Sequence, residues 1–313
     1  MSRRLVADIG GTNSRIAIAD AASGSLDELR SYTNAEFESF EAVLSQWLAQ
    51  LSSAVPREAC LAVAAPPGGD EVEMININWR FSCQSLAQRF GLERVSRLND
   101  FEANALALPH LQDDDYVCLH AGQANKQGRL ATLGPGTGLG GATIVSIDGT
   151  WHASACEPGH IGLSPANAQE LALFERLLAR YNDIFAELLV SGQGLLRLYQ
   201  EIAALKGQRA IHSTPEAVSV AGLNNDEDSR DALGLFCALL GSACGDFVLA
   251  NGAYGGLYLA GGIVPRILPF IAGSAFHARM ISKGAMVEHL RQVPVYAITH
   301  PQPALLGAAN YSH

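Results

Sequence analysis

Glycine clusters interrupt the apolar pattern of this chain twice, at positions far apart in the sequence. Residues 5–20 read LVADIGGTNSRIAIAD, and residues 130–146 read LATLGPGTGLGGATIVS. In each stretch a short apolar run leads into glycines that accompany a threonine, and a second apolar run follows. This pattern predicts two β-hairpins whose turns carry almost no side chains.

The remaining apolar positions alternate between helical and extended periods. Residues 36–51 carry apolar side chains every three or four positions, as an amphipathic helix does. The order of hairpin, helices and strands occurs twice, which suggests two α/β halves hinged around a central cleft. We expect a small domain over 1–110, joined by a C-terminal helix within 300–313, and a large domain over 111–299. Helices are expected at 36–51, 82–90, 101–108, 166–181, 193–205, 228–251 and 301–310, and further strands at 28–33, 60–65, 95–98, 116–119 and 256–260.

Composition narrows the class of protein. The chain has 313 residues, 48% hydrophobic and 17% charged, with 31 glycines, which is typical of a globular α/β protein of about two domains. A net charge of −10 argues against a nucleic-acid partner, which usually requires a basic face. Asp8 ends the first apolar run too early for a secretory signal, and no uninterrupted apolar run is long enough for a membrane span. We therefore expect a cytoplasmic protein.

The six cysteines are scattered, and none forms a Cys-x-x-Cys pair. Cysteines spaced in this way are more often small buried apolar residues in a reducing compartment than disulfides or zinc ligands. We expect all six to be free and buried.

The glycine turns have the composition of a phosphate-binding site. Backbone N–H groups can approach a ligand closely where side chains are missing, and threonine hydroxyls can add hydrogen bonds. Two such turns could hold a polyphosphate, although neither is a Walker A sequence. Asp8, just before the first glycines, could hold Mg²⁺ directly or through water, or it could simply cap its own turn.

Three further motifs carry candidate chemistry. Asn99-Asp100 lies where a strand meets a helix, so the aspartate suits either a general base or a helix N-cap. Glu157 and His160 are spaced to bind two neighbouring hydroxyls of a sugar, although a lone histidine is more often structural. Gly261-Gly262 follows a buried strand and could admit a flat adenine, or it could be a plain strand–helix turn.

Together these motifs resemble bacterial glucokinases of the hexokinase-like type. The resemblance extends from Leu5 to Ala308 with compatible order and spacing. It implies the duplicated ribonuclease-H-like fold of actin-like ATPases, ATP with Mg²⁺, and phosphoryl transfer to the 6-hydroxyl of glucose at the entry of glycolysis. Such enzymes are commonly homodimers. The motifs that carry the resemblance are DIGGTN at 8–13, NDF at 99–101, GTGLG at 136–140, EPGH at 157–160, LVSGQGL at 189–195, AGGIVP at 260–265 and PALLGA at 303–308.

The resemblance also implies a role for individual residues. Asp100 becomes the general base, and Asn99 binds a neighbouring sugar hydroxyl. Glu187, an unremarkable glutamate in its local sequence, joins Glu157 and His160 in binding glucose. The implied ATP contacts are Ala7, Asp8, Ile9, Gly10, Gly11, Thr12, Asn13, Gly136, Thr137, Gly138, Gly261 and Gly262.

Two other interpretations of the sequence compete with that of a bacterial glucokinase. The first is a kinase for fructose, mannose or N-acetylmannosamine, including the related repressor/open-reading-frame/kinase family. That family holds a zinc ion with clustered cysteines, whereas no cysteine occurs here between Cys156 and Cys237. The second is a non-sugar actin-like ATPase, in which the five sugar-facing residues would have no purpose. The chain departs from some bacterial glucokinases at Gly141, Pro158 and Gln193, and Pro158 could stiffen the sugar loop.

Overall fold

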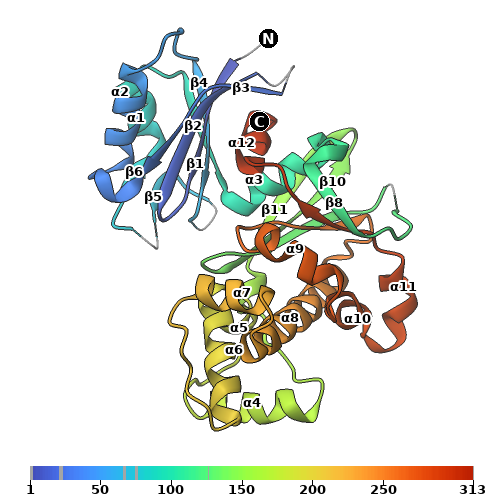
Figure 1. The fold of residues 1–313 in the computed structure, drawn as a ribbon. Coiled ribbons are helices and arrows are strands. Elements are labelled where there is room, and N and C mark those ends of the chain that lie inside the picture. The colour runs from blue at the N-terminus through green and yellow to red at the C-terminus, as the bar shows by residue number, and fades with distance from the viewer. Residues whose placement is uncertain (1–2, 21–23, 66–67, 75–76, 126, 313) are drawn as a thin grey trace. The chain divides into compact units, whose positions relative to one another are not determined.

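The computed structural model describes residues 3–20, 24–65, 68–74, 77–125 and 127–312, and these fall into two compact units (Figure 1). The first unit comprises Met1–Gln112, Thr150–Ala155 and His300–His313. The second comprises Asp113–Gly149 and Cys156–Thr299. Each unit is a mixed α/β structure built on its own sheet.

The sheet of the first unit has the order β3-β2-β1-β4-β7. β1 and β2 form the first predicted hairpin, and β3 continues it antiparallel. β4 and β7 then add parallel to β1. The strands are β1 (Arg3–Ile9), β2 (Asn13–Asp20), β3 (Ser25–Thr33), β4 (Glu58–Val63) and β7 (Arg94–Asn99), with β5 (Glu71–Glu73) and β6 (Arg80–Ser82) as a separate pair.

Helices cover both faces of this sheet (Figure 1). α1 (Phe40–Ala49) and α2 (Cys83–Phe90) pack on one face, where Phe40 and Trp47 are fully buried. α3 (Asp100–Ala107) and the C-terminal α12 (Pro303–Ala309) pack against each other. α12 also packs against β1 and β4, and α3 against β4 and β7. The predicted helix 36–51 begins later than expected, because Asn34–Glu36 forms a separate 3₁₀ turn and Ser39 caps α1. A further 3₁₀ turn, Leu108–His110, follows α3.

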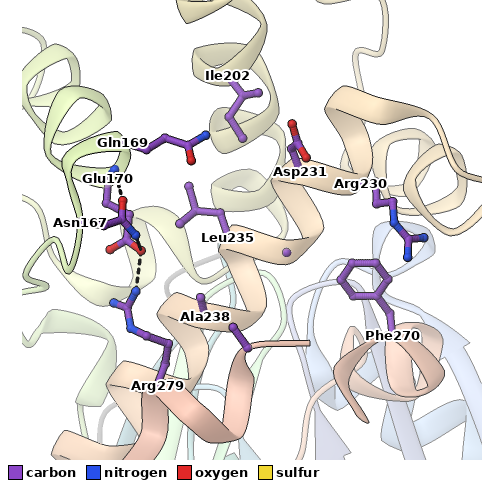
Figure 2. Close-up of a pocket in the computed structure, with 12 residues that line it drawn as sticks. Asn167, Gln169, Glu170, Ile202, Arg230, Asp231, Leu235, Ala238, Phe270 and Arg279 are labelled. Atoms are coloured by element: carbon purple, nitrogen blue, oxygen red, sulfur yellow. Dashed lines mark hydrogen bonds and ion pairs between the residues drawn. The ribbon is translucent and has the colours of Figure 1, made fainter. Parts of the chain in front are cut away.

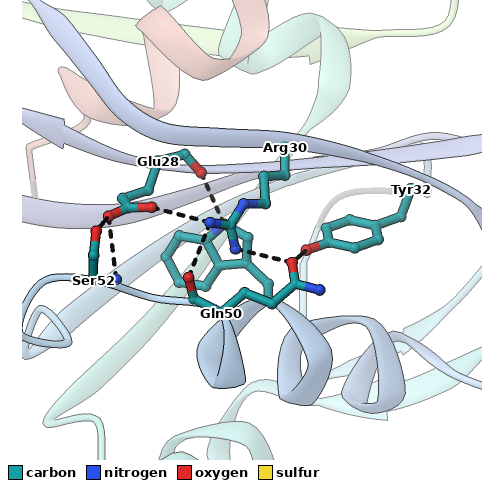
Figure 3. Close-up of polar contacts among 6 residues, drawn as sticks. Glu28, Arg30, Tyr32, Gln50 and Ser52 are labelled. Carbon is teal, nitrogen blue, oxygen red and sulfur yellow. Dashed lines mark hydrogen bonds and ion pairs between the residues drawn. The ribbon is translucent and has the colours of Figure 1, made fainter.

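A network of hydrogen bonds and an ion pair joins β3 to the end of α1 (Figure 3). Glu28 has a φ of 54°, and the pairing of β2 with β3 shifts register beside it. The Glu28 carboxylate accepts hydrogen bonds from the Ser52 backbone and hydroxyl and pairs with Arg30. Arg30 donates in turn to Gln50, and the Trp47 ring nitrogen donates to the Glu28 carbonyl. These contacts stabilise Glu28 in a left-handed backbone conformation, which is unfavourable for residues other than glycine.

The second unit repeats the same order of pairings. β9 and β10 form the second predicted hairpin, and β12 and β13 add parallel to β9. β8 closes the other edge antiparallel to β13. The bounds are β8 (Tyr116–His120), β9 (Leu130–Pro135), β10 (Leu139–Ile147), β12 (Gly256–Leu259) and β13 (Val295–Ile298), while β11 (Thr150–Cys156) follows β10 and is divided between the units.

The core of the second unit forms around α8 (Glu227–Asn251). This helix is long and apolar enough to cross a membrane, but 78% of its most apolar window is buried inside the protein, as in a core helix. The other helices are α4 (Ala168–Leu178), α5 (Ala186–Leu189), α6 (Gly192–Leu205), α7 (Pro215–Leu223), α9 (Val264–Ala272), α10 (Phe276–Ile281) and α11 (Val287–Arg291), with 3₁₀ turns at Asp113–Asp115, Pro158–His160 and Gly284–Met286.

The prediction for the cysteines is only partly right. All six are free, and four of them are buried. Burial raises the pKa of Cys60 and of Cys237 to about 12, so both stay protonated thiols. Cys118, however, is exposed on the edge strand β8, and Cys156 is only half-buried. The apolar local sequence of Cys118 did not reveal that its strand lies at the edge of the sheet.

Candidate functional site

The first glycine turn joins β1 to β2, as the sequence predicts. Ile9 pairs with Ser14, which leaves Gly10, Gly11 and Thr12 outside the strands. The Gly10 N–H donates to the Asn13 carbonyl at 3.0 Å, and the Thr12 side chain is exposed. The turn therefore presents backbone and one hydroxyl at the end of β1.

Asn34 supports this turn from a position more than 20 residues along the chain, and it was not among the residues predicted from the sequence. Its side chain donates to the Gly10 carbonyl at 2.7 Å, and its backbone N–H donates to the Thr12 carbonyl at 2.8 Å. The Ser14 hydroxyl donates to its amide oxygen at 2.8 Å. Asn34 is 3% exposed, so it supports the turn from within. An asparagine after a strand suggests only another turn, and no local signal could have linked it to the glycines.

Asp8 is held by Arg15 on the neighbouring strand, with 3.0 Å between Oδ2 and Nη1. Burial raises the pKa of the Asp8 carboxyl, and the charge of Arg15 opposes that rise. The described residues contain no group of three His, Cys, Asp or Glu placed to hold a metal. A magnesium ion at Asp8 would therefore take most of its ligands from phosphate and water, which is how Mg²⁺ usually binds at nucleotide sites.

Ala7 and Ile9, which flank Asp8, cannot offer side chains to a nucleotide. Both are fully buried in the core of the first unit. The Ile9 carbonyl accepts a hydrogen bond from the Ala64 N–H. Any contact of these two residues with a nucleotide would therefore be made by their backbone, on either side of Asp8 near the end of β1.

Asn99 and Asp100 lie at the same sheet edge as the first glycine turn. Ile9 pairs with Val63 and Val63 with Asn99, so the carboxyl ends of these parallel strands align. Two strand spacings separate β1 from β7, about 10 Å. Asn99 rather than Asp100 is the N-cap of α3, and it forms a capping box with Glu102. The carboxylate of Asp100 also accepts from the Phe101 N–H at 3.0 Å.

The second glycine turn joins β9 to β10 in the other unit. Pro135 pairs with Leu139, so the turn consists of Gly136, Thr137 and Gly138. The Gly136 N–H donates to the Gly138 carbonyl at 2.8 Å, and the Gly192 N–H at the start of α6 donates to the Gly136 carbonyl at 2.9 Å. Thr137 is exposed, as Thr12 is in the first turn.

Glu157 immediately precedes a 3₁₀ turn, Pro158–His160, which follows β11, and His160 is the last residue of that turn. Pro158 and Gly159 are buried, whereas the two polar side chains are exposed. The His160 ring lies against that of Phe185, with 5.5 Å between ring centroids. The buried Pro158 and Gly159 thus anchor the backbone of the turn, while the Glu157 and His160 side chains stay exposed.

Glu187 contacts the second glycine turn directly. It lies on the short helix α5, and its Oε2 accepts from the Leu139 N–H at 2.8 Å. α5 is in turn joined to the segment after the 157–160 turn, because the Ala186 N–H donates to the Ile161 carbonyl at 2.8 Å. The structure thus brings Glu187 to the glycine turn and to the turn that carries Glu157 and His160, a proximity with no signal in its local sequence.

Gly261 lies beside the second glycine turn. It follows β12 with a φ of +84°, and a Cβ there would lie 2.4 Å from the Pro135 carbonyl oxygen. Both the backbone conformation and the close approach require glycine. Gly262 has open space around it, so it could face a ligand.

A pocket of about 490 Å³ lies elsewhere in the second unit, beside α4 and α8 (Figure 2). Glu170 is buried there, pairs with Arg279 and is bonded by Asn167. Arg230 lies over the Phe270 ring, 5.3 Å from its centroid. None of the sequence-predicted site residues lines this pocket, and its charged groups serve the packing of the helices.

Comparisons with known proteins agree with the motifs. The glucokinase family model matches residues 5–313. Curated glucokinases from Psychromonas ingrahamii and Chromobacterium violaceum are 39% and 40% identical; each alignment covers 98% of this chain, and they cover 96% and 88% of the relatives. The solved structure of a glucokinase from an Antarctic psychrotroph is 35% identical with a TM-score of 0.90, covering 99% of this chain and 98% of the other. The chain belongs to the glucokinase family.

Proposed function

We propose that this protein transfers the γ-phosphoryl group of ATP to the 6-hydroxyl of glucose, giving glucose 6-phosphate and ADP. The observation that carries the proposal is the packing of Glu187 and the 157–160 turn around the second glycine turn. Side chains suited to sugar hydroxyls and a turn suited to phosphates lie together in one unit. The curated relatives described above bear the name glucokinase, which supports the same substrate.

Asp100 is the general base of the proposed reaction. Its carboxylate accepts the proton of the sugar 6-hydroxyl while the oxygen attacks the γ-phosphorus and ADP leaves. The capping of α3 by Asn99 leaves Asp100 at the first helical position, where the capping box fixes its backbone. Rigid placement of a base is what in-line transfer requires.

Asn99 has two roles in this proposal. Its amide oxygen accepts the N–H groups of Phe101 and Glu102, and its nitrogen donates to the Ala65 carbonyl at 3.2 Å. An amide nitrogen carries two hydrogens, so the second can be donated to a sugar hydroxyl. Glu157, His160 and Glu187 bind the other hydroxyls of glucose.

The two glycine turns bind the nucleotide phosphates through backbone N–H groups and the hydroxyls of Thr12 and Thr137. Asp8 holds Mg²⁺, directly or through water, and the ion pair with Arg15 opposes the rise in the pKa of Asp8 that burial causes. The metal, when bound, neutralises charge on the transferred phosphoryl group. Gly261 and Gly262 accommodate the adenosine.

We also propose the duplicated actin-like architecture, with a small domain over 1–110 and 300–313 and a large domain over 111–299. The same order of hairpin and parallel strands in each unit supports it. A homodimer is proposed from the resemblance to bacterial glucokinases. A cytoplasmic location is supported by the six free cysteines.

The test is ADP release from ATP and Mg²⁺ with glucose, with 6-deoxyglucose and without sugar. Glucose should give steady ADP release with glucose 6-phosphate as product. 6-Deoxyglucose keeps the ring hydroxyls but lacks the acceptor, so it should give only the rate seen without sugar. Equal ADP release in all three reactions would indicate a non-sugar ATPase and would refute the proposal.

A further inference from the structure

The 157–160 turn is packed tightly on β10. A Cβ at Gly159 would lie 2.7 Å from the Leu139 carbonyl oxygen and 3.2 Å from the Glu187 Cβ. Real side chains essentially never approach so closely, so the turn can occupy this position only with glycine there. Its distance from β10 is therefore set by close contacts.

Gly141 makes the second of these contacts, from the strand side. A Cβ at Gly141 would lie 2.7 Å from Cγ and 3.3 Å from Cδ of Pro158. Pro158 is buried, and its ring is closed on its own backbone, so it has no free end that could rotate away. Any side chain at position 141 must displace the turn itself.

The turn carries Glu157 immediately before Pro158 and His160 two residues after it. We propose that the contact between Gly141 and Pro158 positions Glu157 and His160 for the sugar, so that Gly141 and Pro158 determine the affinity for glucose. Gly141 and Pro158 do not themselves touch the substrate; they act as positioning residues. The inference rests on the proposed function, because it assigns the 157–160 turn to glucose.

The test is a double-mutant cycle with Gly141→Ala, Pro158→Ala and the double variant, measured as KM and kcat for glucose and for ATP. A displacement of about 1 Å can cost about 100-fold in rate, so we expect Gly141→Ala to raise the glucose KM at least about tenfold. The KM for ATP should change much less. The double variant should return close to the glucose KM of Pro158→Ala, because alanine removes the Pro158 Cγ and Cδ atoms. The Thr132 carbonyl oxygen, 3.2 Å from the new Cβ, needs to move by only a few tenths of an ångström.

Gly234→Ala is the matched control. Gly234 lies within α8, and a Cβ there meets nothing within 4 Å. The same substitution should leave both KM values unchanged, so a general effect of replacing a glycine can be recognised.

The outcomes separate this inference from the function on which it rests. A wild-type protein without glucose-dependent ADP release contradicts the proposed function. An active wild type with an unchanged glucose KM in Gly141→Ala, or a double variant as impaired as Gly141→Ala, overturns the positioning role alone. If thermal melting shows that Gly141→Ala does not fold, the glucose KM of Pro158→Ala alone tests the positioning role. Loosening the turn should then raise the glucose KM about threefold, on the scale of a small misplacement, and an unchanged value would overturn the inference.

Discussion

Asp100 is the residue on which the proposed chemistry depends most. Replacing it by alanine removes the base but leaves Asn99 to cap α3. We expect kcat to fall at least about 100-fold, the usual scale for a lost general base. Glucose binding, measured by calorimetry, should change little, because the other sugar residues remain. Asp100→Asn keeps the shape without the base and should lose as much activity; wild-type turnover in either variant would show that another group takes the proton.

The first glycine turn depends on an element outside the hairpin. Asn34 fixes the Gly10 and Thr12 carbonyls from its 3₁₀ turn, and its side chain is buried. Asn34→Ala should raise the KM for ATP while leaving that for glucose nearly unchanged. It should also cost about 1–3 kcal/mol of unfolding free energy, because it leaves the Gly10 carbonyl and the Ser14 hydroxyl without their partner.

Asn167→Ala is the control for that prediction. Asn167 caps α4 through the Glu170 N–H in the second unit, so its loss should destabilise the protein without changing the KM for ATP. Equal KM values for ATP in Asn34→Ala and wild type would show that the first turn needs no brace.

His277 on α10 should make the free energy of unfolding depend on pH. Its His277 stacks on His120 with 3.9 Å between ring centroids, and its buried Nε2 has no hydrogen-bond partner in the described part of the chain. Burial lowers the pKa of His277, and the charges of His120 and Arg291 lower it further. As the pH falls below the ordinary value of about 6.5, the unfolded chain takes up a proton before the folded protein does. The contribution of His277 to the free energy of unfolding is therefore complete above that pH and is lost as the pH falls below it.

Urea unfolding between pH 7.5 and 5.5 measures this effect. The wild-type free energy of unfolding should fall across the range, and His277→Phe, which keeps a ring against His120, should reduce the slope. Parallel curves for the two proteins would mean that other groups account for the pH dependence.

Elements with local signals were predictable from the sequence. Both hairpins, the junction at Asn99-Asp100 and the long core helix α8 follow from glycine clusters, apolar periods and caps. The bonds from Asn34 to Gly10 and from Leu139 to Glu187 join residues 24 and 48 positions apart. No pattern within a short window contains such pairs, so the supports of both glycine turns emerged only from the fold.

At the scale of the whole molecule, the proposed residues are divided between two units of similar topology. Asp8, the first glycine turn, Asn99 and Asp100 belong to the first unit. The second glycine turn and the residues Glu157, His160 and Glu187 belong to the second. The proposed reaction therefore assigns roles to residues of both units. Substrate preference tests the account at this scale, because it requires both sets of residues.

The most direct measurement is kcat/KM for glucose, fructose, mannose and N-acetylmannosamine, each followed as ADP release with ATP and Mg²⁺. A site that hydrogen-bonds particular hydroxyls discriminates strongly against sugars that lack or misplace them, so glucose should be preferred by at least about tenfold. A higher kcat/KM for any of the other three sugars would contradict the assignment of this protein as a glucose kinase.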